Sequence, residues 1–300
     1  MKYTRGMKSE ISKKEGLPQP LKSFLNEDGY DAGSLPTDIS ATRLKDSPRI
    51  GRLWREHRDK IKNKPLSRGF AKLGEAWHHY MFLHAPDHWL AEHRFYATVN
   101  GKIISGAIDA VEPVGGDDCI VWDYKLMTAY KAQTELKDFE RQLNIYAWLL
   151  RQNGKNPVSL RISACIRDWA DAKWRYNNHD NSYPHSMFPV YEMPLWSAEE
   201  AESYVHERTK HHTQEELPLC SDEERWMSEP KFAVTSEKTK KALKLFDTLE
   251  GATEHAARVG SPTYIEKRTA EPIRCQRFCE VAEFCSQYQA ELVGKELLNT

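Results

Sequence analysis

The sequence predicts an α/β protein whose central mixed β-sheet is flanked by helices. Between residues 92 and 126, β-branched and aromatic runs alternate with turn residues, which is typical of strands. Residues 70–83 and 135–150 instead repeat their apolar positions with a helical period. With 300 residues, of which 40% are hydrophobic and 29% charged, the chain can bury a sizeable core.

Three strands are expected to form an antiparallel meander. The first, 92–99, ends at Asn100-Gly101, a strong hairpin signal, and the second follows at 102–111. Turn residues at 115–118 then lead into a strand at 119–126.

The other elements complete a three-part domain plan. A basic amphipathic helix is expected at 51–63, and the 70–83 helix carries an apolar stripe that we expect to face the core: Phe70, Leu73, Trp77, Tyr80 and Met81. Further strands are expected at 158–165 and 187–193, and Ser197 and Glu200 form a capping box that opens a helix to about residue 212. We therefore expect a loose lead-in at 1–37, a core at 38–195, and a C-terminal helical region at 196–300.

Acidic and basic side chains converge on the second and third strands of the meander. Side chains alternate along a strand, so Asp123 and Lys125 project from the same face of 119–126. Pairing of the two strands brings Asp109 close to Asp123. Two carboxylates form a site for a hard divalent cation such as Mg²⁺, and Lys125 is then available to meet an anionic group.

Three short motifs resemble those of one nuclease superfamily. Asp109 followed by Asp123-Tyr124-Lys125 resembles the D…(D/E)xK signature of the PD-(D/E)XK nucleases. Gln142 and Tyr146 match the QxxxY motif of their RecB-like branch, and Gly74 to His78 matches its GxxxH motif. The resemblance covers roughly residues 38–170. It implies a restriction-endonuclease-like core.

The resemblance also implies an activity and roles for the site residues. The expected ligands of Mg²⁺ or Mn²⁺ are His78, Asp109, Asp123 and the backbone carbonyl of Tyr124, while Lys125 positions the nucleophile. Gln142 and Tyr146, one helical turn apart, are expected to pack over the site and contact the substrate strand. The implied function is a metal-dependent DNA exonuclease in phage or prophage recombination or in DNA repair. The alternatives are an endonuclease, a DNA-end-binding module with a vestigial site, and a metal-sensing or structural iron–sulfur protein.

Four residues are candidates for DNA contacts. By resemblance, Arg43 and Arg49 lie beside the DNA path, although they could equally be ordinary surface residues. Thr128 and Lys131, between the third strand and the following helix, could grip phosphates. Residues 1–72 contain 17 Lys and Arg against 9 Asp and Glu, which suits a polyanion but also a solvated helical surface.

The cysteines near the C-terminus resemble an iron–sulfur motif. Cys275, Cys279 and Cys285 are similar to the C-terminal cluster of RecB-like nucleases with an iron–sulfur cofactor, including CRISPR-associated exonucleases. Those proteins usually have a two-residue first gap and an N-terminal fourth cysteine, whereas here the gap is three and no cysteine precedes Cys119. Cys220 is then the best fourth ligand, for [4Fe–4S] or Zn²⁺. The alternative is small buried cysteines on a helix, as we expect for Cys119 and Cys165 in strands.

No apolar run approaches the roughly 20 residues that span a bilayer, and the first 16 residues lack the apolar stretch of a signal peptide. We therefore expect a cytoplasmic protein of a bacterial or phage-infected cell, with cysteines that are thiols or metal ligands rather than disulfides. The expected partners are linear duplex or single-stranded DNA and a recombination protein, with no membrane.

Overall fold

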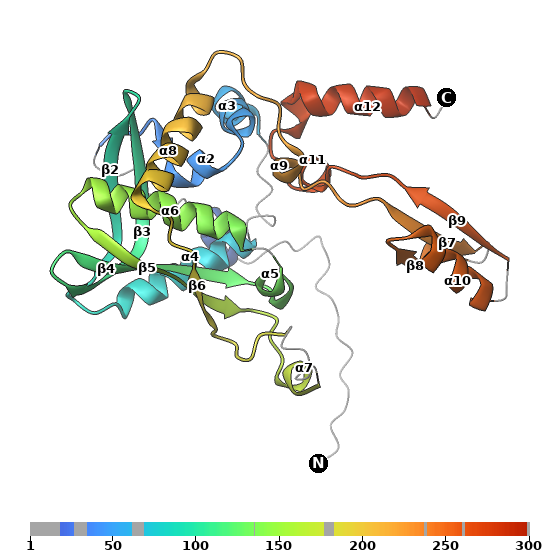
Figure 1. Cartoon of the computed structure of the whole chain (residues 1–300), viewed down its shortest axis with the longest axis horizontal. Helices are drawn as coiled ribbons and strands as arrows, with labels where there is room; N and C mark the ends of the chain where they lie inside the picture. The colour runs from blue at the N-terminus through green and yellow to red at the C-terminus, as the bar shows by residue number, and fades with distance from the viewer. Residues whose placement is uncertain are drawn as a thin grey trace. The chain divides into compact units, whose positions relative to one another are not determined.

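The computed structural model describes residues 19–26, 35–61, 69–134, 136–176, 183–236, 239–259 and 262–298 (Figure 1). The chain forms two compact units. The first comprises residues 1–41 and 62–203, and the second comprises residues 42–61 and 204–300. The sequence placed 42–61 with the core, whereas the structure groups this segment with the C-terminal residues. Of the expected lead-in, the structure describes helix α1 (Gln19–Asn26) and the residues from 35 onward.

The first unit contains the expected central mixed sheet. Its strand order is β1–β3–β4–β5–β6, with β2 paired to β3. The β1–β3 and β4–β5 pairs are parallel, and the other pairs are antiparallel. The strands are β1 (Ile39–Ser40), β2 (Leu90–Val99), β3 (Lys102–Gly115), β4 (Asp118–Met127), β5 (Asn156–Ile166) and β6 (Val190–Met193).

The antiparallel meander β2–β3–β4 is confirmed, together with both of its turns. Asn100 (φ 50°) and Gly101 (φ 70°) occupy the left-handed region that a tight hairpin turn requires. Val99 consequently pairs with Lys102, and this turn sets the register of the whole β2–β3 ladder. At the second turn, Gly115 and Gly116 also have positive φ values (139° and 55°).

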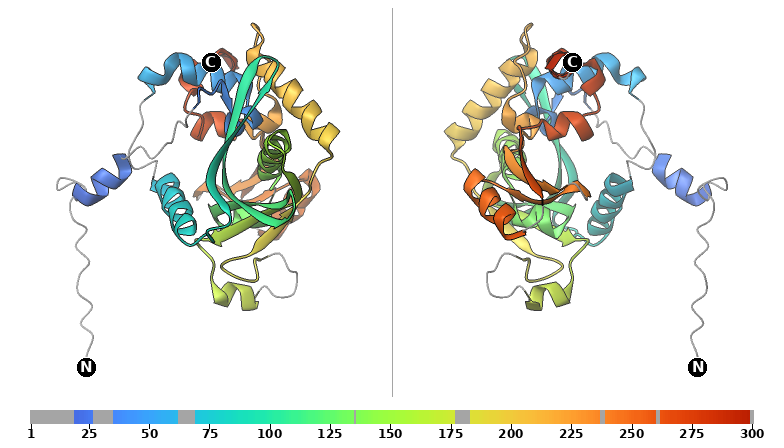
Figure 2. Two further views of the ribbon diagram at one scale, coloured as in Figure 1. Left: turned by 90° about the vertical axis from the view of Figure 1, so that its left-hand side faces the viewer. Right: turned by 90° about the vertical axis from the view of Figure 1, so that its right-hand side faces the viewer.

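Helix α6 (Lys137–Gln152) packs against this sheet and supplies much of the core (Figures 1 and 2). Figure 2 shows the long strands β2 and β3 curving around it. Gly106 on β3 allows this close approach, because a Cβ there would lie 2.8 Å from the Tyr146 ring and 2.9 Å from Leu149 Cδ1. The first unit also contains α4 (Gly69–Leu83), α5 (Ala129–Gln133) and α7 (Asp171–Tyr176).

Helix α4 corrects one expectation from the sequence. The stripe expected to face the core includes side chains that are largely exposed: Phe70 (65%), Leu73 (49%) and Tyr80 (60%). Phe82 and Leu83 are exposed as well, so apolar residues occur on more than one side of this helix. The apolar spacing therefore could not identify the buried face.

The second unit combines helices with a small sheet. Its elements include α3 (Pro48–His57), the short 3₁₀ turn η1 (Arg58–Lys60), α9 (Asp222–Arg225), α10 (Leu249–Val259), α11 (Ile273–Arg277), η3 (Ala282–Phe284) and α12 (Ser286–Leu298). The strands β7 (Lys231–Ser236), β8 (Thr239–Phe246) and β9 (Thr263–Arg268) form an antiparallel sheet in the order β8–β7–β9. The region expected to be helical thus contains strands. They were missed because they are short and their lysines interrupt the apolar alternation.

Two helices join the units along the chain. Helix α2 (Ala41–Lys45) begins at the last residue of the first stretch of unit one, and α8 (Ala198–Thr213) passes from the first unit into the second at Ser203/Tyr204. The capping box at the start of α8 is confirmed, since the Ser197 hydroxyl accepts from the Glu200 N–H and the Glu200 carboxylate accepts from the Ser197 N–H. No helix in the described ranges is long and apolar enough to cross a membrane.

Candidate active site and cysteine pocket

Three acidic residues lie in a row across β2, β3 and β4. The pairs Ala91–Ala110 and His93–Ile108 place Glu92 opposite Asp109. The pair Ala110–Trp122 places Asp123 next in line with Asp109 on the other side. Regular pairing of β3 with β4 ends here, because the Tyr124 N–H donates to Asp109 Oδ2 at 2.6 Å.

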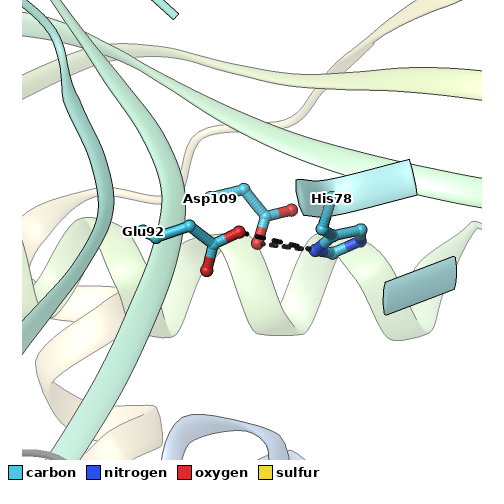
Figure 3. A group of neighbouring side chains, drawn as sticks. All are labelled: His78, Glu92 and Asp109. Carbon is cyan, nitrogen blue, oxygen red and sulfur yellow. Dashed lines mark ion pairs between the residues drawn. The ribbon is translucent and has the colours of Figure 1, made fainter. Parts of the chain in front are cut away.

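Helix α4 adds an imidazole to this row. His78 Nδ1 lies 3.4 Å from Asp109 Oδ1 and 3.9 Å from Glu92 Oε1 (Figure 3). One ligand atom from each of His78, Glu92 and Asp109 lies within 4.8 Å of the other two. This spacing suits ligands of a single metal ion.

Asp123 and Lys125 form the buried part of the site. Lys125 Nζ lies 2.6 Å from Asp123 Oδ2, as expected for neighbours on the same strand face. Both carboxylate oxygens of Asp123 are buried without a geometrically satisfactory hydrogen bond. The Lys125 ammonium also lies 5.5 Å from the centre of the Phe139 ring at the start of α6. An under-coordinated buried carboxylate is what a bound cation would satisfy.

The pKa values at the site reflect competition between burial and neighbouring charges. Burial raises the pKa of Asp123, and the charge of Asp109 adds to this effect. Burial opposes the charged forms of Lys125 and His78, but the neighbouring carboxylates outweigh it and raise both pKa values. Burial also disfavours the charged form of Asp109, yet His78 and Lys125 lower its pKa. Without a metal, two cationic side chains therefore partly neutralise the carboxylates.

The side chains of Gln142 and Tyr146 are hydrogen-bonded to each other on α6. The Gln142 side-chain amide donates to the Tyr146 hydroxyl at 2.8 Å, and both residues are buried. The helical spacing therefore does bring the two polar groups together.

Three of the four candidate DNA contacts, Arg43, Arg49 and Thr128, make local contacts in the structure. Arg49 donates to the backbone carbonyls of Leu217 (3.0 Å) and Pro218 (3.2 Å), and the Arg43 guanidinium lies over the Trp54 ring. The Thr128 hydroxyl caps α5 by accepting from the backbone N–H of Lys131. These contacts give Arg49 and Thr128 structural tasks, and a phosphate contact by either residue stays a prediction.

Lys131 differs from the other three candidates. Its ammonium lies 5.5 Å from the centre of the Phe139 ring, the same distance as the Lys125 ammonium. It therefore projects toward the aromatic ring that borders the site.

Glu92 was missed by the sequence reasoning. It stood at the first position of an expected strand and belongs to no motif. A signal was nevertheless present, because the Asn100-Gly101 turn fixes the register and thereby places Glu92 opposite Asp109. Glu112, three residues after Asp109 on β3, instead accepts a hydrogen bond from the Trp122 indole at 2.7 Å.

The second unit gathers the four candidate cysteines around one pocket. Cys220, Cys275, Cys279 and Cys285 all line it, together with Ile50 and Leu53 of α3. The Ser47 hydroxyl lies 3.1 Å from Cys220 Sγ. Cys119 and Cys165 are buried in β4 and β5, where the sequence placed them.

Charged groups surround this pocket. Arg274 forms a two-pronged ion pair with Asp46, with both N–O distances 2.8 Å. Arg274 and Arg225 also lie close enough to the thiols for their charges to interact. Burial raises the pKa of Cys220 to about 11 and raises the pKa of Cys279, so these thiols are protonated in the metal-free protein.

Two β-strands thus separate at a point that presents carboxylates and a lysine, with an imidazole on a flanking helix. The family model of the PD-(D/E)XK nuclease superfamily matches residues 43–286, and the chain belongs to this superfamily. No curated protein matches the chain. Among solved structures, the crystal structure of SSO0001 is similar, with 19% identity and a TM-score of 0.45 over 64% of this chain and 82% of that chain. A likeness at this level adds nothing to the assignment.

Proposed function

We propose that this nuclease is a metal-dependent DNA exonuclease of the RecB-like type. The observation that carries the proposal is the meeting of His78, Asp109, Asp123 and Lys125 at the point where β3 and β4 separate. The Gln142–Tyr146 pair on α6 supports the RecB-like assignment, and linear DNA ends are the substrate that this branch implies.

The residues present fit a Mg²⁺ or Mn²⁺ ion. Asp109, Asp123, His78 and the backbone carbonyl of Tyr124 would hold it, and Asp123 Oδ1, buried and without a hydrogen bond, is available for this purpose. A bound ion would lower the pKa of a coordinated water and polarise the phosphoryl oxygen.

The chain's own groups supply the remaining requirements of phosphodiester hydrolysis. Lys125 keeps its proton because neighbouring carboxylates raise its pKa, so its ammonium can stabilise charge that develops on the phosphate. Asp123 holds this ammonium in place at 2.6 Å. The Tyr124 N–H fixes the orientation of the Asp109 carboxylate. At the start of α6, the Phe139 ring centre lies 5.5 Å from the Lys125 ammonium.

The decisive experiment compares end-labelled linear DNA with closed circular DNA, in Mg²⁺, in Mn²⁺ and in a chelator. We expect stepwise digestion of linear duplex or single strands only when metal is present, and none by Asp123→Asn. Cleavage of the circle would instead identify an endonuclease. Retention of linear DNA without cleavage under any metal would identify an end-binding module and overturn the catalytic proposal.

We further propose that the four cysteines of the second unit hold a [4Fe–4S] cluster. Tetrahedral thiolates around one Zn²⁺ lie only about 3.8 Å apart, given zinc–sulfur bonds of about 2.3 Å. Among the residues that the structure describes, no three of these thiols come within 4.8 Å of one another, although all four line the same pocket. The wider spacing suits a cluster that is larger than a single ion.

Anaerobic purification tests this cofactor. We expect visible absorption near roughly 400 nm, the region where thiolate-bound iron–sulfur clusters absorb, and about four iron atoms per chain. Cys220→Ser should reduce the iron content, whereas the matched variant Cys119→Ser should leave it unchanged because Cys119 is buried in β4. Stoichiometric zinc without iron would contradict the proposal.

A role in phage or prophage recombination or in repair, together with a recombination partner protein, completes the proposal. Cells that express the wild-type chain should recombine linear DNA more often than cells that express Asp123→Asn. Equal frequencies would argue against this role.

A further inference from the structure

We propose that stacked aromatic side chains on and beside α4 bind single-stranded DNA and lead its end to the metal site. The inference rests on the proposed function and names its substrate class, a single strand rather than a duplex. Its test measures DNA binding in chelator, so that binding and cleavage are measured separately.

Two stacked pairs carry exposed rings on this part of the first unit. The Phe188 ring stacks on Trp77 of α4, with ring centres 5.9 Å apart and an angle of 11° between the planes. At the start of α4, the Arg167 guanidinium lies 3.6 Å from the centre of the Phe70 ring. Phe70 (65%) and Phe188 (55%) nevertheless remain largely exposed. Exposed apolar side chains that gather in one place are typical of an interaction surface.

The spacing of the two pairs fits stacked bases. Phe70 and Trp77 are seven residues apart on α4, which is about 10.5 Å along a helix, and seven residues return to nearly the same side of it. Bases in a nucleic acid strand follow one another at about 3.4 Å, so this distance corresponds to about three bases. Every base has a π-face that an aromatic ring can accept, and in a duplex these faces are covered by neighbouring base pairs. The surface therefore selects unpaired bases and tolerates any sequence.

The surface is continuous with the metal site. Lys125 pairs with Ala164 of β5, whose N–H donates to the carbonyl of the residue after Phe188. Because adjacent strands are about 4.8 Å apart, the backbone beside Phe188 lies about 10 Å from that of Lys125. Trp77, the other ring of this stack, directly precedes the metal-site residue His78 on α4. Bases on the rings are thus only a few nucleotides from the phosphate at the metal site.

Cationic side chains border the surface. The Arg167 N–H donates to the Met127 carbonyl, so this residue lies at the carboxyl ends of the parallel strands β4 and β5. Ligands of open α/β sheets bind outside such strand ends. The α5 helix follows β4 directly and brings Lys131 to the same end, while the Asp168 carboxylate is engaged by the Ala129 N–H at 2.7 Å. A guanidinium held against a ring suits contact with a phosphate of a single strand.

The test measures binding of labelled oligothymidine, and of a blunt duplex of the same length, to the full chain in chelator by fluorescence anisotropy. We expect the wild type to bind the single strand more tightly than the duplex. Phe70→Ala and Phe188→Ala should each weaken single-strand binding about 5- to 150-fold, the loss of one stacked base, and change duplex binding less than about twofold. The control Tyr264→Ala removes a ring that is 52% exposed on the sheet of the second unit, and it should bind like the wild type.

Two further variants separate base stacking from other uses of an apolar surface. Phe188→Leu keeps an apolar side chain but removes the ring, so it should lose single-strand affinity as Phe188→Ala does. Arg167→Gln should make the slope of log affinity against log salt concentration shallower by about 0.7, the value of one phosphate contact on a single strand.

Four results would overturn the inference: unchanged single-strand affinity in either alanine variant, full affinity in Phe188→Leu, an equal loss of affinity for the duplex, or an unchanged salt slope in Arg167→Gln. Self-association that the alanine variants abolish without affecting DNA binding would also overturn it, in favour of a second copy as the occupant. If the rings bind single strands but no DNA is cut in Mg²⁺ or Mn²⁺, the inference stands and the proposed function fails. If DNA is cut and the ring variants bind and digest it as the wild type does, the proposed function stands and the inference fails.

Discussion

Replacing Gly106 with alanine tests whether the close contact of α6 with β3 positions the site. An added Cβ would lie 2.8 Å from a ring carbon of Tyr146 and 2.9 Å from Leu149 Cδ1. Carbon atoms normally approach to about 3.5–4.0 Å, so the helix or its side chains must move by roughly 1 Å. The movement falls directly on Tyr146, which accepts the hydrogen bond from Gln142.

The expected cost of Gly106→Ala follows from two opposing effects. Overpacking a core destabilises by about 1–3 kcal/mol. The loss of backbone freedom in the unfolded chain returns about 0.4–1 kcal/mol. We therefore expect a net loss of roughly 0.5–2 kcal/mol in the free energy of unfolding, and a fall in turnover of up to ~10²-fold because about 1 Å of displacement reaches the site.

Urea unfolding followed by circular dichroism measures the first effect, and digestion of linear DNA measures the second. The matched control is Gly74→Ala on α4, where a Cβ would meet no atom within 4 Å. Because alanine is the better helix former, this control should stabilise the protein by up to ~1 kcal/mol. If Gly106→Ala is as stable and as active as the wild type, the reasoning about this contact is wrong.

Three further predictions concern charged groups. In chelator, protonated His78 pairs with Asp109, and this pair should stabilise the wild type over His78→Gln fully below the unfolded histidine pKa of about 6.5. The stability difference should fade as pH rises through the raised pKa of His78 in the folded protein. Melting temperatures of both proteins between about pH 5 and about pH 9 measure the difference, and a difference that grows with pH would refute the prediction. Asp46→Asn should lower the free energy of unfolding by about 1–3 kcal/mol, because it disrupts a partly buried ion pair with Arg274. The control Asp171→Asn, which disrupts an exposed ion pair, should change the free energy of unfolding by less than about 0.5 kcal/mol. Equal urea midpoints for the two variants would contradict this prediction. Lys125→Met should bind linear DNA in chelator yet cut it about 10²–10³-fold more slowly in Mg²⁺, and unchanged turnover would remove the lysine from the mechanism.

Short local patterns in the sequence were sufficient to predict many of the strands and turns of the first unit. Asn100-Gly101 and the 115–118 turn have strong conformational preferences, so both hairpins could be predicted from a few residues. Strand alternation likewise placed Asp123 beside Lys125. These features depend on neighbours in the chain or across one turn.

Features that depend on distant packing could not be predicted in the same way. The buried side of α4 depends on which residues approach it, and its apolar side chains point in several directions. Arg49 was expected to be either a DNA contact or an ordinary surface residue, and no local pattern indicated that its guanidinium donates to the backbone carbonyls of residues 217 and 218. Glu92 combines both situations. The Asn100-Gly101 turn in the sequence was enough to predict the register that places Glu92 opposite Asp109, but nothing in the sequence indicated the left-handed backbone conformation of Glu92.

The path of the chain through the two units has a consequence for biosynthesis. Residues 42–61 emerge from the ribosome early, but the carbonyls and the arginine that hold Arg49 and Asp46 belong to residues beyond 204. Residues 42–61 can therefore form these contacts only after strands β2–β6 of the sheet, which lie between them in the sequence, have been translated. A ribosome that stops before Leu217 would release a chain in which Arg49 and Asp46 lack all of these partners, and proteases would then reach the segment that contains them.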